Sequence, residues 1–393
     1  MTNADAWPGD FYALRYTLPT EDQALLADLR TLMIDQVAPV INDHWTRASF
    51  PHELVPEIAK LGIVGVSYKG YGFRGRSALL EGFIALEVGR TDPSMATFLG
   101  VHGGLCAASI YLCGSEEQRQ RWLPAMARLE KIGSFGLTEP EVGSAAAGGL
   151  QTTARRDGGN WVLNGRKRWI GNASFADVNV IWARDVTDNQ VKGFVVEKRT
   201  PGYSTEVMQD KIALRVVQNA MITLDDCRIP DENKLTNANS FADTAKVLRL
   251  TRAYVAWQAT GCALGAFEHA LAYAKRREQF GRPIGGFQLV QDLLVRMLSG
   301  ITTSMTLCHR LSALIDEGGC SEEQASLAKA YCTSSARETV GLARELLGGN
   351  GILLEEQVGR FVADAEAIYS YEGTREINTL IVGRALTGTS AFV

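Results

Sequence analysis

The sequence predicts an α+β fold with an N-terminal helical domain, a small central β domain and a C-terminal helical bundle. Three observations lead to this prediction. Apolar residues recur at helical spacing up to about residue 131, the period then shortens toward two, and long helical patterns return from residue 241 to the end. We therefore expect domains at 1–131, 132–240 and 241–393.

The N-terminal region contains several segments with helical spacing and recognisable starts. Thr20–Gln23 reads as a capping box, which predicts that a helix follows it. Further helices are expected at 51–61 and 76–88. Another should begin after Gly114, where Ser115–Gln118 has the same capping pattern.

Gly70–Gly75 spells G-x-G-x-x-G and has Asp92 about twenty residues further on, which imitates a dinucleotide-binding fingerprint. The fingerprint requires a preceding strand and alternating strand–helix units, and the pattern here is helical. We interpret the segment as a glycine-rich loop. A nicotinamide-dependent enzyme remains a distant alternative.

The central region carries strand and turn signals. Asn164-Gly165 lies between two short apolar runs, which predicts a hairpin turn. Other strands are expected at 178–183, 193–196 and 220–224. The last region should form a bundle of long helices, at Phe241–Arg276, Gly286–Asp316 and Ser321–Leu347.

Composition excludes several classes of function. The chain has 393 residues and a net charge of −4, which favours neither nucleic acid nor an anionic membrane as a partner. Its seven cysteines form no Cys-x-x-Cys pair and its five histidines no His-Glu-x-x-His pair, so we expect no metal site. We also expect no membrane span, and with neither a signal pattern nor a peroxisomal tripeptide, a cytoplasmic location.

Glu372 is the candidate catalytic residue. It follows one helical pattern and precedes Gly373 and a second pattern from Arg375 to Leu386. The aromatic neighbours Tyr369 and Tyr371 should raise the pKa of its carboxyl, which suits a general base. The alternative is that Glu372 only begins the last helix, where acidic residues are favoured by the helix dipole.

Other stretches offer features that suit a ligand. The loop from Phe135 to Ser144 presents backbone N–H groups and hydroxyls, and Trp169–Gly171 places a flat ring before a residue without a side chain; both suit a flat heterocycle. A core Trp and an ordinary turn are equally compatible with these patterns. Arg277 suits a phosphate or a plain helix C-terminus. Gly348-Gly349 allows close approach of backbone to a ligand.

Taken in order, the motifs FGLTEP with a later GS, W-I-x-N, R-x-Q-F-G, LGGNGI and YEGT resemble the acyl-CoA dehydrogenase family. The resemblance covers nearly the whole chain. Within the family the chain is most similar to glutaryl-CoA dehydrogenases and to the short-chain acyl-CoA oxidases of peroxisomes.

The resemblance implies FAD as cofactor, an acyl-CoA thioester as substrate, a homotetramer and electron-transfer flavoprotein as the electron acceptor. It implies that Glu372 removes the α-proton while hydride leaves the β-carbon for the flavin. The implied substrate contacts are Ser144, Arg252, Tyr371 and Gly373. It implies that Thr374 and Glu376 lie near the adenosine of the cofactor. The other implied cofactor contacts in the same chain are Phe135, Leu137, Thr138, Ser144, Trp169, Ile170 and Gly171. The implied contacts to the cofactor of a dimer-related subunit come from the segments around Arg277, Gln279, Phe280, Gln288, Leu347, Gly348 and Gly349.

Two positions depart from the family pattern, and a third departs from the pattern of its glutaryl-CoA dehydrogenase branch. Ala145 stands where Asp is common after Gly-Ser, and Gly171 where many dehydrogenases have Thr near the reactive flavin nitrogen. Glutaryl-CoA dehydrogenases carry an Arg at the position of Ala96. We therefore expect a short-chain acyl-CoA dehydrogenase. An acyl-CoA oxidase that uses O2, a glutaryl-CoA dehydrogenase and a non-catalytic helical scaffold are the alternatives.

Overall fold

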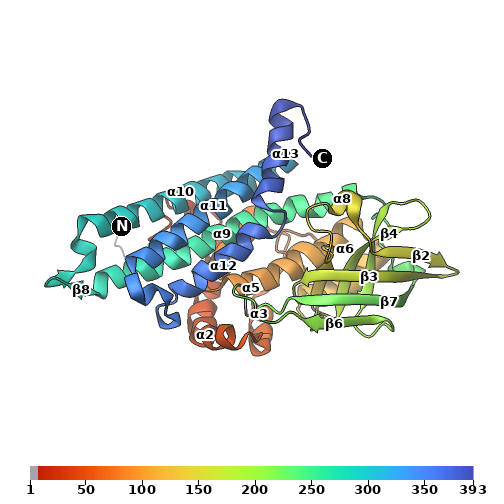
Figure 1. Ribbon diagram of the computed structural model, residues 1–393, viewed down its shortest axis with the longest axis horizontal. Coiled ribbons are helices and arrows are strands. Elements are labelled where there is room, and N and C mark those ends of the chain that lie inside the picture. The colour runs from red at the N-terminus through yellow and green to blue at the C-terminus, as the bar shows by residue number, and fades with distance from the viewer. Residues whose placement is uncertain (1–7, 393) are drawn as a thin grey trace.

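The computed structural model describes residues 8–392, and the predicted fold class is confirmed. The central sheet forms one end of an elongated molecule, and the long C-terminal helices extend away from it (Figure 1). Residues 1–7 and 393, on which the expectations about targeting segments partly rest, lie outside the described residues. The N-terminal helices are α1 Thr20–Leu32, α2 Ala38–Arg47, α3 Val55–Leu61, α4 Ala78–Thr91, α5 Pro93–Leu99, α6 Ala108–Cys113 and α7 Glu116–Ala127.

Short π-helical segments join some of these helices into longer rods. Met33–Val37 connects α1 to α2, and Gly100–Ala107 connects α5 to α6. The second rod, Pro93–Cys113, is apolar and long enough to cross a membrane by length and composition, contrary to the expectation that no run reaches that length. Most of it is buried in the fold, as in the core helix of a soluble protein.

Within residues 8–392, the central sheet has seven strands, and β4 pairs with three of the others. Strand β5 pairs antiparallel along one edge of β4, and β1 and β2 pair parallel with it on the other edge. The sheet then continues through β3 and β7 to β6, all antiparallel. The strands are β1 Gly133–Gly136, β2 Thr153–Asp157, β3 Asn160–Ile170, β4 Val178–Asp185, β5 Val191–Glu197, β6 Tyr203–Val207 and β7 Ala220–Pro230, with the short helix α8 Ala146–Gly149 after β1.

The C-terminal bundle follows the predicted helices closely. A two-stranded hairpin, β8 Glu278–Gln279 and β9 Arg282–Pro283, separates its first two helices and lies at the end of the molecule farthest from the sheet (Figure 1). The helices are α9 Phe241–Arg276, α10 Gln288–Asp316, α11 Glu322–Leu346, α12 Val358–Ser370 and α13 Arg375–Thr387.

Two local predictions are wrong. Thr20 is the first residue of α1 and caps nothing, because the chain enters the helix from Pro19. Asn164-Gly165 is not a hairpin turn but an irregularity inside β3, where pairing with β7 shifts register. A Cβ on Gly165 would lie 2.7 Å from Thr152 Cα, so the close approach of the neighbouring strand requires glycine there. The hairpin turn lies earlier, at Gly158-Gly159, between β2 and β3.

Two other expectations are confirmed. Ser115 and Gln118 form the predicted capping box, with Ser115 Oγ accepting from Gln118 N at 3.3 Å. The Gly70–Gly75 segment is a loop in which all three glycines have positive φ. A glycine-rich loop between helices α3 and α4 does not have the strand–loop–helix context of a dinucleotide fingerprint.

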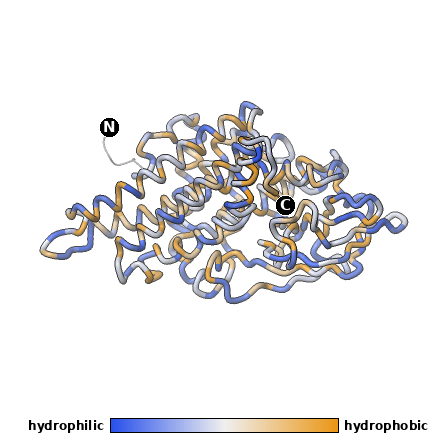
Figure 2. The backbone as a smooth tube through the Cα atoms, turned by 45° about the horizontal axis from the view of Figure 1, so that its top comes forward, coloured by the Kyte–Doolittle hydropathy of each residue, from blue (hydrophilic) through white to orange (hydrophobic). Residues whose placement is uncertain are grey.

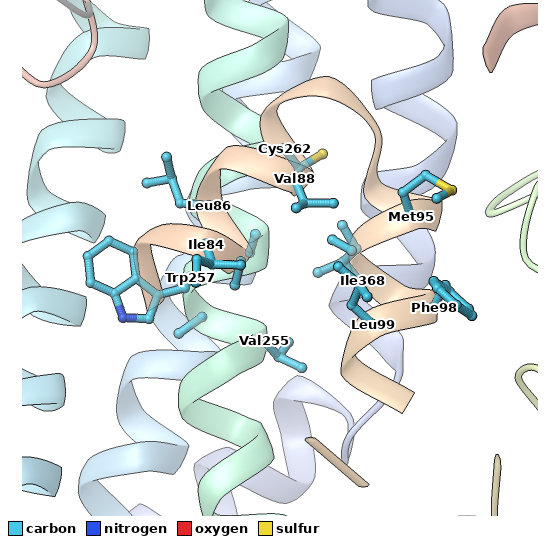
Figure 3. Close-up of a cluster of buried hydrophobic side chains, with 14 of the residues drawn as sticks. Ile84, Leu86, Val88, Met95, Phe98, Leu99, Val255, Trp257, Cys262 and Ile368 are labelled. Carbon is cyan, nitrogen blue, oxygen red and sulfur yellow. The ribbon is translucent and has the colours of Figure 1, made fainter. Parts of the chain in front are cut away.

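The core lies where α4, α5, α9 and α12 meet. Hydrophobic and hydrophilic residues both recur along the bundle helices (Figure 2), and many of the hydrophobic ones are buried. Ile84, Leu86, Trp257 and Ile368 are among the side chains that fill the centre (Figure 3). Helices α4 and α9 approach so closely that a Cβ on Gly261 would lie 2.3 Å from the Leu86 carbonyl oxygen.

This close contact yields a stability prediction. Gly261→Ala forces backbone against backbone, so the free energy of unfolding should fall by roughly 1–3 kcal/mol despite the better helix propensity of alanine. Gly341, in α11, has open space around its Cβ position, and Gly341→Ala should raise stability by about 0.5–1 kcal/mol. Urea unfolding of both variants tests this, and equal shifts of the two would contradict it.

Candidate active site

Glu372 lies in the short loop between α12 and α13, with Tyr371 before it and Gly373 after it. Its φ of +56° is unusual for a residue with a side chain, and such strain is typical of functional positions. Helix α13 begins at Arg375, and Thr374 is its cap, accepting from Ile377 N at 3.3 Å. Glu372 therefore lies outside the helix, so the interpretation that it merely begins the last helix is wrong.

Lys329 fixes the backbone of this loop. It is fully buried on α11, and its Nζ donates to the carbonyl oxygens of Tyr369 at 2.8 Å and Gly373 at 2.7 Å. Asn378 also donates to the Gly373 carbonyl, at 2.9 Å. Burial lowers the pKa of Lys329 to about 8, and the nearby Glu372 carboxylate counteracts part of that effect. The backbone on both sides of Glu372 is therefore held by one buried cation.

The carboxyl of Glu372 is partly buried against α9. Its Oε2 accepts a hydrogen bond from Thr251 Oγ1 at 2.7 Å. Burial raises the pKa of Glu372, while the Thr251 hydrogen bond and the charges of Arg252 and Lys329 counteract part of that rise. Arg252 itself pairs with Glu322 at 2.8 Å, so its charge is shared between the two carboxylates.

Tyr371 holds the other side of the loop. Its hydroxyl donates to Gln258 Oε1 at 2.5 Å, and Gln258 Nε2 in turn donates to Thr97 Oγ1 at 2.7 Å and to the Pro93 carbonyl at 3.0 Å. A chain of hydrogen bonds thus connects the Glu372 loop through α9 to α5. Tyr371 serves here as a packed support for the loop, as well as being an expected substrate contact.

Several expected cofactor residues cluster where β1 and β3 end. Phe135 and Leu137 are buried, whereas the ring of Trp169 is 53% exposed at the end of β3. The core-Trp interpretation is therefore wrong. Beneath them, Lys167 Nζ donates to the Leu137 carbonyl at 3.1 Å and to Glu139 at 2.8 Å. The exposed ring of Trp169 and the apolar side chains near it suit a flat heterocycle such as a flavin. The Lys167–Glu139 ion pair holds this part of the sheet in place.

Other members of this group lie nearby with different exposures. Thr138 accepts at its carbonyl from Arg168 N at 2.8 Å, Ile170 is buried at the end of β3, and Ser144 is exposed in the loop before α8. Ala145 is exposed as well and caps α8 through its carbonyl. A Cβ on Gly171 would lie 3.2 Å from Val101 Cγ2, so the space left by the missing side chain is already filled by the π segment.

The remaining expected residues do not join this group in one chain. Arg277, Gln279 and Phe280 are exposed on the β8–β9 hairpin at the far end of the bundle, with Phe280 92% exposed (Figure 1). Arg277 also forms the C-cap of α9. Gln288 begins α10, and Leu347, Gly348 and Gly349 follow α11. A site that needs both groups therefore requires a second chain.

Thr374 and Glu376 lie beside Glu372 at the start of α13. Thr374 is the helix cap, and Glu376 is exposed and paired with Arg375 at 3.0 Å.

The residues that sequence reasoning missed are Thr251, Lys329 and Gln258. They are ordinary residues within long helices and lie far from Glu372 in sequence, so no local signal marked them.

Comparison with known proteins identifies the family of this chain. The models of the acyl-CoA dehydrogenase N-terminal, middle and C-terminal domains match residues 19–130, 134–227 and 241–387. An acyl-CoA dehydrogenase of Bacillus subtilis is 31% identical over 375 residues, which cover 94% of this chain and 99% of that protein.

Two solved structures are similar over nearly their whole length. A glutaryl-CoA dehydrogenase from Mycobacterium smegmatis in complex with FADH2 has a TM-score of 0.94 and 36% identity, covering 98% of each chain. The butyryl-CoA dehydrogenase of Megasphaera elsdenii has a TM-score of 0.90 and 30% identity, covering 94% of this chain and 98% of that one. The chain belongs to the acyl-CoA dehydrogenase family, whose members are oxidoreductases that act on CoA thioesters.

Proposed function

We propose that this chain is an FAD-dependent acyl-CoA dehydrogenase that introduces an α,β double bond into short-chain acyl-CoA thioesters, with Glu372 as the base. The observation that carries the proposal is the partly buried Glu372 carboxyl. Its pKa is raised by burial, its loop is held by Lys329, and Thr251 orients it. A base that is fixed and poised in this way suits removal of a weakly acidic α-proton.

The residues around Trp169 would hold the flavin ring in this proposal. Phe135, Leu137 and Trp169 offer apolar and aromatic surface, and Thr138 and Ser144 offer polar groups. The bound flavin supplies the acceptor for the hydride that leaves the β-carbon. The relative solved with FADH2 supports FAD as the cofactor.

The protein's own part of the reaction is proton transfer and positioning. A Glu372 oxygen takes the proton from the α-carbon, and the hydrogen bond from Thr251 fixes the orientation of the carboxylate. Among the described residues, the backbone N–H of Glu372 donates to no protein acceptor, which leaves it available to the thioester oxygen that gains charge. Arg252 and Gly373 would border the thioester, as the family resemblance implies.

The two separated groups of cofactor residues support an assembly of several copies. If Arg277, Gln288 and Gly349 reach the cofactor of another subunit, the flavin site is complete only in an oligomer, and we propose a homotetramer. Sedimentation of the flavin-saturated protein tests this, and a saturated monomer would refute it.

The seven unpaired cysteines support a reducing compartment, the cytoplasm.

The electron acceptor in this proposal is electron-transfer flavoprotein rather than O2. Gly171 lacks the side chain that many dehydrogenases have there, but this does not open a path for O2, because Val101 and Val217 occupy the space beside Gly171. Gly171 therefore does not favour the oxidase alternative. Dye-linked turnover should exceed peroxide formation, and equal rates of the two would identify an oxidase.

Glu372→Gln tests the catalytic assignment directly. The amide keeps the size and the hydrogen bond from Thr251 but cannot take a proton, so kcat should fall by at least roughly 10²–10⁴-fold while bound flavin still colours the protein. Glu366→Gln, at an exposed glutamate on α12 paired with Arg337, is the control and should leave kcat unchanged. A Glu372→Gln variant with near-native kcat would remove this residue from the mechanism.

Thr251→Val tests the electrostatics of the base. The Thr251 hydrogen bond stabilises the carboxylate and so lowers the pKa of Glu372. The base is active only when deprotonated, so activity rises with pH through that pKa. Loss of the hydroxyl should raise the pKa and move the acidic limb of the kcat profile to higher pH. An unshifted limb would show that the hydrogen bond does not tune the base.

The surroundings of Ala96 predict discrimination against a substrate that carries a distal carboxylate. Ala96 is fully buried on α5, and it stands where glutaryl-CoA dehydrogenases are expected to carry the Arg that pairs with the distal carboxylate. A carboxylate brought into this closed region without a cation costs several kcal/mol. We therefore expect kcat/KM for butyryl-CoA to exceed that for glutaryl-CoA by at least about tenfold. Equal values for the two substrates would contradict the assignment.

A further inference from the structure

A cavity of about 60 Å³ lies between the start of α4, the π segment, α9 and α10. Thr251, which donates to Glu372, is one of its walls, and Tyr254 and Trp257 extend the same wall along α9. Ser67, Glu81 and Ser312 supply polar groups to its lining from other elements. The cavity therefore lies one side chain away from the base and also borders a carboxyl group.

The Glu81 end of this cavity holds a carboxyl group and, among the described residues, no cation. Glu81 accepts a hydrogen bond from Ser67, and burial raises the pKa of its carboxyl, with Asp316 adding to that effect. Asp316 accepts from Ala78 N at 2.7 Å at the same end. Among the described residues, no Lys or Arg lines the cavity. Glu81 thus has the hydroxyl and the backbone N–H of Ser67 as donors, and no cationic partner of the kind that buried carboxylates ordinarily have.

The size of the cavity limits what it accepts. A volume of 60 Å³ has room for about four water-sized atoms, at roughly 15 Å³ each. The first three carbons of an acyl group must stay at the reaction centre, where the α- and β-carbons react. The cavity therefore accommodates about three further carbons and one terminal polar atom.

We propose that Glu81 is a specificity-determining residue that receives the distal end of the acyl chain and favours a hydrogen-bond donor there, a hydroxyl or an amine. The inference rests on the proposed dehydrogenase function. A donor adds a hydrogen bond to the Glu81 carboxyl, whereas a methyl end offers it none and a carboxylate end adds a like charge. The chemistry thus points to acyl-CoA thioesters of about six carbons with a donor at the last carbon.

The experiment compares kcat/KM for hexanoyl-, 6-hydroxyhexanoyl-, 6-aminohexanoyl- and adipoyl-CoA, with butyryl-CoA as the short reference. Wild-type protein should prefer the hydroxyl or the amino substrate over hexanoyl-CoA by at least about tenfold, with adipoyl-CoA lowest. Preference for the hydroxyl end alone indicates a neutral carboxyl, and preference for the amine indicates an ionised one. Either preference supports the inference.

The variants separate Glu81 from general pocket effects. Glu81→Leu should invert the preference toward hexanoyl-CoA, and Glu81→Gln, which keeps an acceptor of the same size, should keep the preference for the hydroxyl substrate. Glu81→Gln also covers the case in which Glu81→Leu fails to fold. The control Glu317→Gln, at an exposed glutamate paired with Arg310, should behave as wild type.

Butyryl-CoA distinguishes failure of this inference from failure of the proposed function. It extends only one carbon beyond the reaction centre, so its kcat/KM should be the same in every variant. The role of Glu81 is overturned, and the dehydrogenase function is kept, if butyryl-CoA is turned over but one of two results is found. Either the wild-type kcat/KM for 6-hydroxyhexanoyl-CoA is about equal to that for hexanoyl-CoA, or the ratio of the two is unchanged in Glu81→Leu. Absence of turnover with every thioester by flavin-saturated wild-type protein overturns the dehydrogenase function and this inference with it.

Discussion

The buried ion pair between Arg360 on α12 and Asp92 at the start of α5 is the constraint on which the site depends. Both side chains are almost fully buried. Arg360 also donates to the Thr91 carbonyl at 3.2 Å, to Gln357 Oε1 at 3.0 Å and to Asn42 at 3.2 Å. Loss of one partner of such a pair typically costs about 3–5 kcal/mol, because a buried charge is left unpaired. The pair therefore permits one position of α12 against α5.

One turn further along α12, Asp364 extends this constraint to the other parts of the molecule. Its Oδ1 accepts from Trp45 Nε1 at 3.2 Å, which ties α12 to α2, and from Leu214 N at 2.6 Å, which ties it to the loop before β7. The N-terminal helices, the sheet and the bundle thus meet on one helix. Because α12 ends at Ser370, the placement of this helix also sets where the Glu372 loop begins.

The loop itself is then fixed from the opposite side. Lys329 exchanges its hydration for two backbone carbonyls and the neighbouring Glu372 charge, and Thr251 holds the carboxyl from α9. A carboxyl supported in this way reorganises little when its charge changes, which is the physical basis of efficient proton transfer. The cavity beside Thr251 differs from this loop, since among its lining residues Glu81 is a buried carboxyl and, within residues 8–392, no Lys or Arg lines it.

The sequence by itself determined the order of helices and sheet, the bounds of α9, and the candidacy of Glu372, because long periodic segments and ordered motifs are local signals. It failed at Asn164-Gly165, because a dipeptide that favours a turn also fits a bulge when a neighbouring strand approaches closely. Only the tertiary structure brought Thr251 to Glu372 across 121 residues and Lys329 to Gly373 across 44. Helical spacing says which face of a helix is buried, whereas the partner of that face depends on how the helices pack.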